Sequence, residues 1–163
     1  MKSNLYNESV IIAGAGPVGL TAALYLLLKN IPVTIIDSYI SVPTDPRAST
    51  FHPPTLELLE KINVTQEMLN RGKIVNNWQY RDRKKGVIAE FNLDILSDIT
   101  KYPFRLHFEQ HKFAQMLLKK VESYKISKVI KGAEIINSQQ DLNTIYINYI
   151  KDGKKFELNG RYL

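Results

Sequence analysis

The chain contains 163 residues, of which 44% are hydrophobic and 23% are charged, and its formal net charge is +6. This composition is typical of a globular domain and excludes a disordered chain, while the absence of cysteine excludes disulfides, thiolate metal sites and a cysteine nucleophile. The basic charge suits an anionic partner such as a nucleotide. The lysines are scattered and form no basic stripe, so we expect no nucleic-acid binding. A chain without cysteine is compatible with the cytoplasm, which is the expected location.

The stretch from residue 10 to residue 28 has no charged side chain and is about as long as a transmembrane helix. The glycine-rich segment 14–19, which includes a proline, would break such a helix and leave backbone groups unpaired in lipid. A signal peptide would need a basic start, whereas here Lys2 is offset by Glu8. We therefore expect no membrane span, and we divide the stretch into two elements.

The first of these elements is the apolar run Val10–Ala13, which is typical of a strand buried in a parallel sheet. A helix is expected over Pro17–Lys29, because a first helical turn accepts proline and Asn30 marks a stop. Its aliphatic residues surround nearly the whole circumference, which predicts a deeply packed helix. The β-branched run Val33–Ile36 predicts a second strand that ends at Asp37. Together these elements form a βαβ unit.

Three glycines between the first strand and the helix follow the spacing GxGxxG. Gly14 permits a tight turn after the strand, Gly16 lets the backbone approach a pyrophosphate, and Gly19 lets helix and strand pack closely. A phosphate would lie at the helix N-terminus, where backbone amides and the helix dipole favour an anion. Asp37 stands where its carboxylate can accept hydrogen bonds from the hydroxyls of a ribose. The pattern predicts a dinucleotide site without choosing between NAD and FAD.

A long loop rich in proline follows the second strand and leads to an amphipathic helix that begins at Thr55. Arg47 lies in this loop, where an arginine taken alone is more often a solvated surface residue. Farther along, Gln110 stands at the start of a helix, where its side chain either faces a ligand or caps the backbone. His107 and His111 flank it, but two ligands do not complete a metal site. We expect no metal and no catalytic histidine here.

Two β patterns occupy the rest of the chain. Alternating strands flank the charged turn at residues 81–86, which predicts a hairpin whose Trp78 and Tyr80 either line a pocket or fill a core. A further buried strand is expected at residues 125–130, and the alternation over residues 145–158 predicts an antiparallel meander. The expected fold is therefore α/β, with a Rossmann-like βαβ unit, an antiparallel β-meander and a β-hairpin excursion.

Several segments resemble the flavin-binding region of the class A flavoprotein monooxygenases, the aromatic-ring hydroxylases related to para-hydroxybenzoate hydroxylase. The matching segments are VIIAGAGPVGLTAALYL, VTIID, PRASTFHPPTLELLEKI and YPFRLHFEQHKFAQMLL. They span most of residues 8–123, and the arginine–alanine pair before a leucine-rich helix is particular to this group. The resemblance implies a flavoprotein monooxygenase that uses FAD, NAD(P)H and O2 to hydroxylate a small, phenol-like aromatic substrate.

The resemblance also assigns the residues that contact FAD. The expected set is Gly14, Ala15, Gly16, Pro17, Val18, Gly19, Asp37, Arg47, Ala48 and Gln110. Within it, the glycines hold the pyrophosphate, Asp37 holds the adenosine ribose, and Arg47 with Ala48 lies at the flavin side. Because the cofactor performs the difficult steps, no side chain is predicted to be catalytic. Residues 74–104 correspond to an excursion toward the substrate side.

The family's aspartate-glycine motif, its later glycine-aspartate motif and its substrate domain are not found in this sequence. We therefore expect residues 1–163 to be an incomplete N-terminal FAD-binding domain that retains FAD weakly and does not hydroxylate alone. A strand starting at Arg161 is expected to return to the parallel sheet. Two other functions stay open, namely a cofactor-binding fragment or interaction module without catalysis, and a non-hydroxylating FAD oxidoreductase. The sequence does not indicate an oligomeric state.

Overall fold

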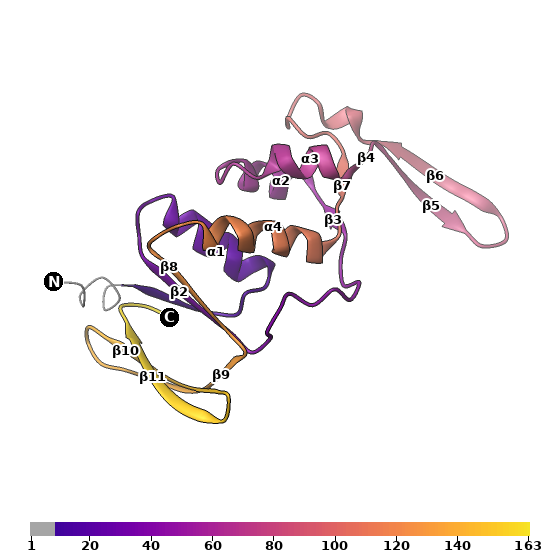
Figure 1. The fold of residues 1–163 in the computed structure, drawn as a ribbon. Helices are drawn as coiled ribbons and strands as arrows, with labels where there is room; N and C mark the ends of the chain where they lie inside the picture. Colours follow the sequence, from indigo (N-terminus) through magenta and orange to yellow (C-terminus); the bar gives the residue numbers. More distant parts are fainter. Residues whose placement is uncertain (1–8) are drawn as a thin grey trace. The chain divides into compact units, whose positions relative to one another are not determined.

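The computed structural model describes residues 9–163, and these divide into two compact units. The first unit comprises the chain up to residue 45 together with residues 111–163, and the second comprises residues 46–110. The mixed α/β class expected from the sequence is confirmed (Figure 1). Among the described residues, no helix is long and apolar enough to cross a membrane.

A parallel sheet forms the centre of the first unit. Its strands are β1 (Val10–Ala13), β2 (Val33–Asp37) and β8 (Ser127–Lys131), in the order β1-β2-β8. Helix α1 (Pro17–Leu27) connects β1 to β2, which confirms the predicted βαβ unit. The helix ends earlier than expected, and Asn30 then adopts a φ of 59° that turns the chain toward β2.

Helix α1 buries one face, so the expectation of a helix packed around nearly its whole circumference is wrong. The buried residues are Leu20, Ala23, Leu24 and Leu27. Their spacing is that of a single stripe along a helix that lies on a sheet. Val18, in contrast, is 83% exposed on the other side of α1. The aliphatic residues of this segment therefore do not indicate which side of the helix is buried.

Helix α4 (Gln110–Glu122) and the meander complete the layers of the first unit. Figure 1 shows α1 and α4 on one side of the parallel sheet and the meander on the other side. The meander consists of the antiparallel strands β9 (Ala133–Gln140), β10 (Ile145–Lys151) and β11 (Lys154–Gly160), as predicted. The hydrophobic core between sheet and meander contains Ile11, Ile36, Ile130, Ala133, Ile145, Ile147 and Tyr149.

The residues that follow the meander return to the parallel sheet. Tyr162 forms a parallel bridge with Val10, and its carbonyl oxygen accepts a hydrogen bond of 2.8 Å from the amide of Ile11. The amide of Arg161 donates to the carbonyl of Ser9 at 2.9 Å. Tyr162 therefore extends the sheet on the side of β1 opposite β2. This confirms the predicted return of the chain at Arg161.

The second unit is built around a small antiparallel sheet and two helices. Its sheet has the order β3-β7-β4, with β3 (Thr50–Phe51), β7 (Arg105–His107) and β4 (Lys73–Val75). Helix α2 (Pro53–Glu60) begins before the predicted Thr55, because its two prolines fit a first helical turn. Helix α3 (Thr65–Arg71) follows. The buried residues of this unit include Leu56, Leu59, Ile62, Met68, Leu106 and Phe108.

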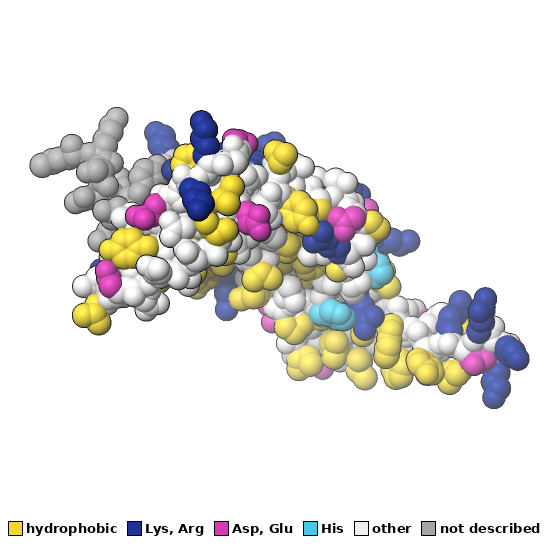
Figure 2. Space-filling model, turned by 90° about the horizontal axis from the view of Figure 1, so that it is seen from below, with side chains coloured by type: hydrophobic (Ala, Val, Ile, Leu, Met, Phe, Trp, Pro, Cys, Tyr) yellow, Lys and Arg dark blue, Asp and Glu magenta, His cyan; other side chains and the backbone are white. Residues whose placement is uncertain are grey.

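The predicted hairpin consists of β5 (Asn77–Asp82) and β6 (Gly86–Asn92), followed by the 3-10 helix η1 (Leu93–Leu96). Trp78 stacks on Phe91 across the strands, with their ring centroids 5.3 Å apart. Trp78 is 42% exposed and Tyr80 is 60% exposed, so neither fills a core among the described residues. Figure 2 shows hydrophobic side chains along one side of the hairpin and basic side chains at its tip.

Candidate functional site

The turn after β1 is shaped by its first glycine. Gly14 has a φ of 105°, a conformation that L side chains rarely adopt. Its amide donates a hydrogen bond of 2.8 Å to the carbonyl of Ile36, the residue before the end of β2. The turn is therefore attached to the carboxyl edge of the parallel sheet, where ligands of open α/β sheets bind.

The other two glycines differ in what surrounds them. A Cβ atom at Gly16 would have no described heavy atom within 4 Å, so the backbone of this residue is open to a ligand. A Cβ atom at Gly19 would lie 2.1 Å from the carbonyl oxygen of Gly14 and 3.1 Å from a methyl carbon of Ile12. Gly16 therefore leaves space for approach, whereas Gly19 permits close packing of helix, turn and strand.

The N-terminus of α1 is ready to receive an anion. Gly16 is the N-cap residue, and within the described part of the chain no side chain caps the helix and no acid lies in its first turn. Pro17 occupies the first helical position. No carboxylate of this helix therefore competes for the positive end of the helix dipole and the first-turn amides, which favours a phosphate there.

Asp37 lies beside this turn, at the end of β2, and its carboxylate is half-buried. One oxygen, Oδ2, accepts a hydrogen bond of 2.5 Å from the amide of Ala15. The other, Oδ1, accepts one of 2.7 Å from the amide of Tyr39. The structure thus brings together Asp37 and the glycine turn, as the sequence predicted. Nothing in the sequence indicated the two backbone donors, because every residue except proline carries the same amide.

The loop after β2 is also tied to the end of β8. The amide of Gly132 donates a hydrogen bond of 3.1 Å to the carbonyl of Tyr39, and Gly132 has a φ of 65°. Sequence reasoning missed this contact. The sequence feature that could have indicated it is the glycine directly after the strand pattern of β8, where a left-handed backbone is needed.

Three of the predicted cofactor residues lie in the second unit. Arg47 and Ala48 are exposed and precede β3, and Gln110 is the first residue of α4. The amide of Gln110 donates a hydrogen bond of 2.8 Å to the carbonyl of Ala48. Ala48 and Gln110 are thus neighbours in space despite their distance in sequence. Gln110 stands at a helix start, as predicted.

The described residues contain no group of three or more His, Asp or Glu side chains that could hold a metal ion. His52 is the N-cap residue of α2, where no side-chain cap is formed within the part of the chain that is described. His107 pairs with Thr50 and Lys73 in the small sheet.

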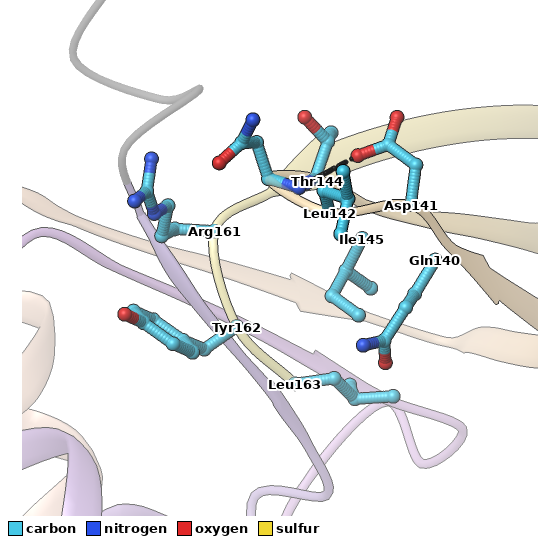
Figure 3. Close-up of a pocket in the computed structure, with 9 residues that line it drawn as sticks. Gln140, Asp141, Leu142, Thr144, Ile145, Arg161, Tyr162 and Leu163 are labelled. Atoms are coloured by element: carbon cyan, nitrogen blue, oxygen red, sulfur yellow. Dashed lines mark hydrogen bonds between the residues drawn. The ribbon is translucent and has the colours of Figure 1, made fainter.

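A separate hollow of about 200 Å³ lies between the β9–β10 turn and residues 161–163 (Figure 3). Asp141 shapes the turn, because its Oδ1 accepts hydrogen bonds of 2.8 Å from the amides of Asn143 and Thr144. The hydrogen bond from the Asn143 amide is the main cause that lowers the pKa of Asp141. None of the predicted cofactor residues lines this hollow. It is distinct from the glycine turn.

Comparison with known proteins identifies the family. A model of the FAD binding domain family matches residues 7–163. The chain belongs to this FAD-binding family. Its glycine turn and the carboxylate of Asp37 are therefore features of a domain whose cofactor is FAD rather than NAD.

Two named monooxygenases are similar to this chain along most of its length. The chain is 26% identical over 156 residues to a para-nitrophenol 4-monooxygenase of Pseudomonas sp., covering 96% of this chain and 39% of the relative. It is 24% identical over 158 residues to pentachlorophenol 4-monooxygenase of Sphingobium chlorophenolicum, covering 96% of this chain and 29% of the relative. The chain thus spans well under half the length of these relatives.

The crystal structure of p-nitrophenol 4-monooxygenase from Pseudomonas putida has the same fold as this FAD-binding chain. The TM-score is 0.91 and the sequence identity is 23%. The match covers 94% of this chain and 39% of that structure. Both units of the present chain lie within the matched part, since so little of the chain is left out.

Proposed function

We propose that this chain is the FAD-binding part of a flavoprotein monooxygenase that uses NAD(P)H and O2 to hydroxylate a small, phenol-like aromatic compound. The observation that carries the proposal is the glycine turn, which is open at Gly16, lies at an uncapped helix N-terminus and adjoins the carboxylate of Asp37. The aromatic substrate class is suggested by relatives named for para-nitrophenol and pentachlorophenol. We place the protein in the cytoplasm, with which a chain without cysteine is compatible.

The residues of the first unit fit the diphosphate and the adenosine of FAD. Gly14, Gly16 and Gly19 give a turn whose backbone a pyrophosphate can approach, together with Ala15, Pro17 and Val18. Asp37 has lone pairs left for the hydroxyls of the adenosine ribose, because each oxygen accepts one hydrogen bond from the described residues. When bound, FAD supplies the redox chemistry, and these residues bind and orient it.

The second unit would contribute the flavin side. Arg47 and Ala48 lie at the end of the proline-rich loop, and the hydrogen bond between Ala48 and Gln110 fixes the backbone of both segments. We assign these residues to the flavin end of the cofactor. We assign residues 74–104, which include the exposed aromatic side chains of the β5–β6 hairpin, to the substrate side.

The FAD assignment is tested with Asp37→Ala. Loss of charge-assisted hydrogen bonds to the ribose is expected to cost about 1.5 to 3 kcal/mol of FAD binding. Fluorescence titration of FAD measures this, and Asp82→Ala, in the hairpin turn, is the matched control. An unchanged affinity in Asp37→Ala would remove the ribose contact from the proposal.

The catalytic assignment is tested on the full gene product. A yellow protein that consumes O2 with NADPH and forms a hydroxylated phenol is the expected result. Oxidation of NADPH without hydroxylated product would indicate a non-hydroxylating FAD oxidoreductase. FAD binding without NADPH oxidation would indicate a module that binds the cofactor and catalyses nothing.

A further inference from the structure

The carboxylate of Asp37 bridges two backbone segments. Its Oδ2 accepts from the amide of Ala15, inside the glycine turn, and its Oδ1 accepts from the amide of Tyr39, in the loop that leaves β2. Ala15 is 22 residues away in sequence, so this contact is tertiary. A single side chain thus links the turn that follows β1 to the chain that leaves β2.

Two other aspartates also accept hydrogen bonds from two backbone amides, but each does so with one oxygen. Oδ1 of Asp82 accepts from the amides of Lys84 and Lys85, at 2.8 and 2.7 Å. Oδ1 of Asp141 accepts from two amides in the same way. These are local turns. Asp37 differs because both of its oxygens are needed and because one of its donors is distant.

This arrangement does not prevent contact with a ligand. Each carboxylate oxygen has two lone-pair sites, and each oxygen of Asp37 receives one hydrogen bond from an amide. One site per oxygen therefore stays available to a hydroxyl donor. The same carboxylate can hold the backbone and accept hydrogen bonds from a ribose at the same time.

We propose that Asp37 is a positioning residue, which holds the glycine turn in its binding conformation before FAD arrives. This role is additional to the ribose contact and, for its effect on affinity, rests on the proposed function. A turn that is already ordered loses less conformational freedom when the pyrophosphate binds, so binding is stronger. The amide of Ala15 is the reporter of this role, because it belongs to the turn and donates directly to Asp37.

The proposal makes a specific claim about asparagine. The asparagine side chain has one acceptor oxygen and one NH2 donor, so in Asp37→Asn a donor must face either the Ala15 amide or the Tyr39 amide. In Asp82→Asn the single oxygen can still accept from both amides, as the aspartate does now. Asparagine should therefore disrupt one of the two backbone contacts at position 37 and preserve both contacts of the turn at position 82.

The first experiment uses the FAD-free chain. Exchange of backbone amides with water is measured by NMR in the wild type, Asp37→Asn and Asp82→Asn. In Asp37→Asn the amide of Ala15 or Tyr39 should exchange roughly tenfold faster, because a hydrogen bond to a charged group is lost. In Asp82→Asn the amides of Lys84 and Lys85 should change by less than about twofold. Unchanged exchange of both Ala15 and Tyr39 in Asp37→Asn would overturn the proposal.

The second experiment separates positioning from ribose contact. Wild type and Asp37→Ala are titrated with FAD and with an FAD analogue whose adenosine lacks the 2′ and 3′ hydroxyls. If Asp37 only contacts ribose, both proteins bind the analogue equally, and the positioning role is wrong. If Asp37 also holds the turn, Asp37→Ala, which removes the acceptor of the Ala15 amide, binds the analogue at least about fivefold more weakly.

The two experiments also separate this inference from the proposed function. A chain that binds no FAD would contradict the proposed function, while amide exchange would still decide whether Asp37 holds the turn. Thermal unfolding shows whether Asp37→Asn is folded. If it is not, Asp37→Ala, which removes both acceptors without adding a donor, is measured in its place with the same expected exchange.

Discussion

Gly19 contacts the backbone of Gly14 so closely that a Cβ atom at Gly19 would lie 2.1 Å from the Gly14 carbonyl oxygen. The obstacle is backbone in a turn whose amide is bonded to Ile36, so it cannot rotate away as a flexible side chain would. Gly19→Ala must displace α1 from the turn and is expected to lower the free energy of unfolding by about 2 to 4 kcal/mol. Urea denaturation measures this, and an unchanged midpoint would show that the helix can shift at no cost.

Gly16→Ala is the matched variant at the neighbouring glycine. Its Cβ would meet no described atom within 4 Å, and its φ of −76° is open to any residue. We expect a change in unfolding free energy within about 0.5 kcal/mol, since nothing is displaced. FAD affinity should fall at least about tenfold, because the methyl group occupies the space that the pyrophosphate needs. Normal FAD binding by this variant would place the pyrophosphate elsewhere.

The βαβ unit was predictable from the sequence because its signals are local. A β-branched run, a proline in the first helical turn and glycines at fixed spacing each specify the conformation of their own segment, and β1, β2 and the start of α1 lie where expected. The burial of α1 was not predictable in this way. An aliphatic residue such as Val18 is exposed or buried according to what the rest of the chain places beside it.

The sequence predicted the residues of the candidate site that are recognised by their side chains, but not its backbone contacts. Gly14 and Asp37 carry a chemical signature, whereas the donors to Asp37 are backbone amides of Ala15 and Tyr39, which any residue but proline supplies. The bond between Ala48 and Gln110 is of the same kind. Such contacts depend on the tertiary arrangement, so they cannot be predicted from a sequence pattern.

Thr34 offers a test of the core between the parallel sheet and the meander. It is fully buried, and its Oγ1 has no hydrogen-bond partner among the described residues. It pairs with Ile11 in the sheet, so both side chains point to the same apolar face. Thr34→Val, which replaces the hydroxyl by a methyl group of similar size, should raise the free energy of unfolding by about 1 kcal/mol. A loss of stability in thermal or urea unfolding would reveal a partner for the hydroxyl.

Arg47→Ala tests the flavin-side assignment. The residue is exposed in a loop, so its truncation should change unfolding by less than about 1 kcal/mol. Loss of a charge-assisted contact should weaken FAD binding by about 1.5 to 3 kcal/mol. Arg83→Ala, at the exposed tip of the hairpin, is the control and should leave FAD affinity unchanged. Equal affinities for the two variants would remove Arg47 from the site.

The hairpin carries its own spectroscopic reporter, because Trp78 is the single tryptophan of the chain. Its ring lies next to Phe91 on one strand and next to the guanidinium of Arg105, which is 5.1 Å from the ring centroid. Phe91 is directly opposite Trp78 in the register of the two strands. The fluorescence of the intact protein therefore reports on the packing of this cross-strand pair.

Phe91→Ala removes the ring that stacks on Trp78 and leaves the strand backbone unchanged. An aromatic cross-strand pair contributes about 0.5 to 1.5 kcal/mol, and an isolated two-stranded sheet has little stability to spare. We expect the Trp78 emission to shift to longer wavelength and its quenching by acrylamide to increase, because the indole becomes more exposed. Val87→Ala, opposite Arg81 and outside the stack, is the control and should leave both signals unchanged. If Phe91→Ala also left both signals unchanged, the stack would not hold Trp78 in solution, and the aromatic side of the hairpin would be ordered by something other than its own cross-strand packing.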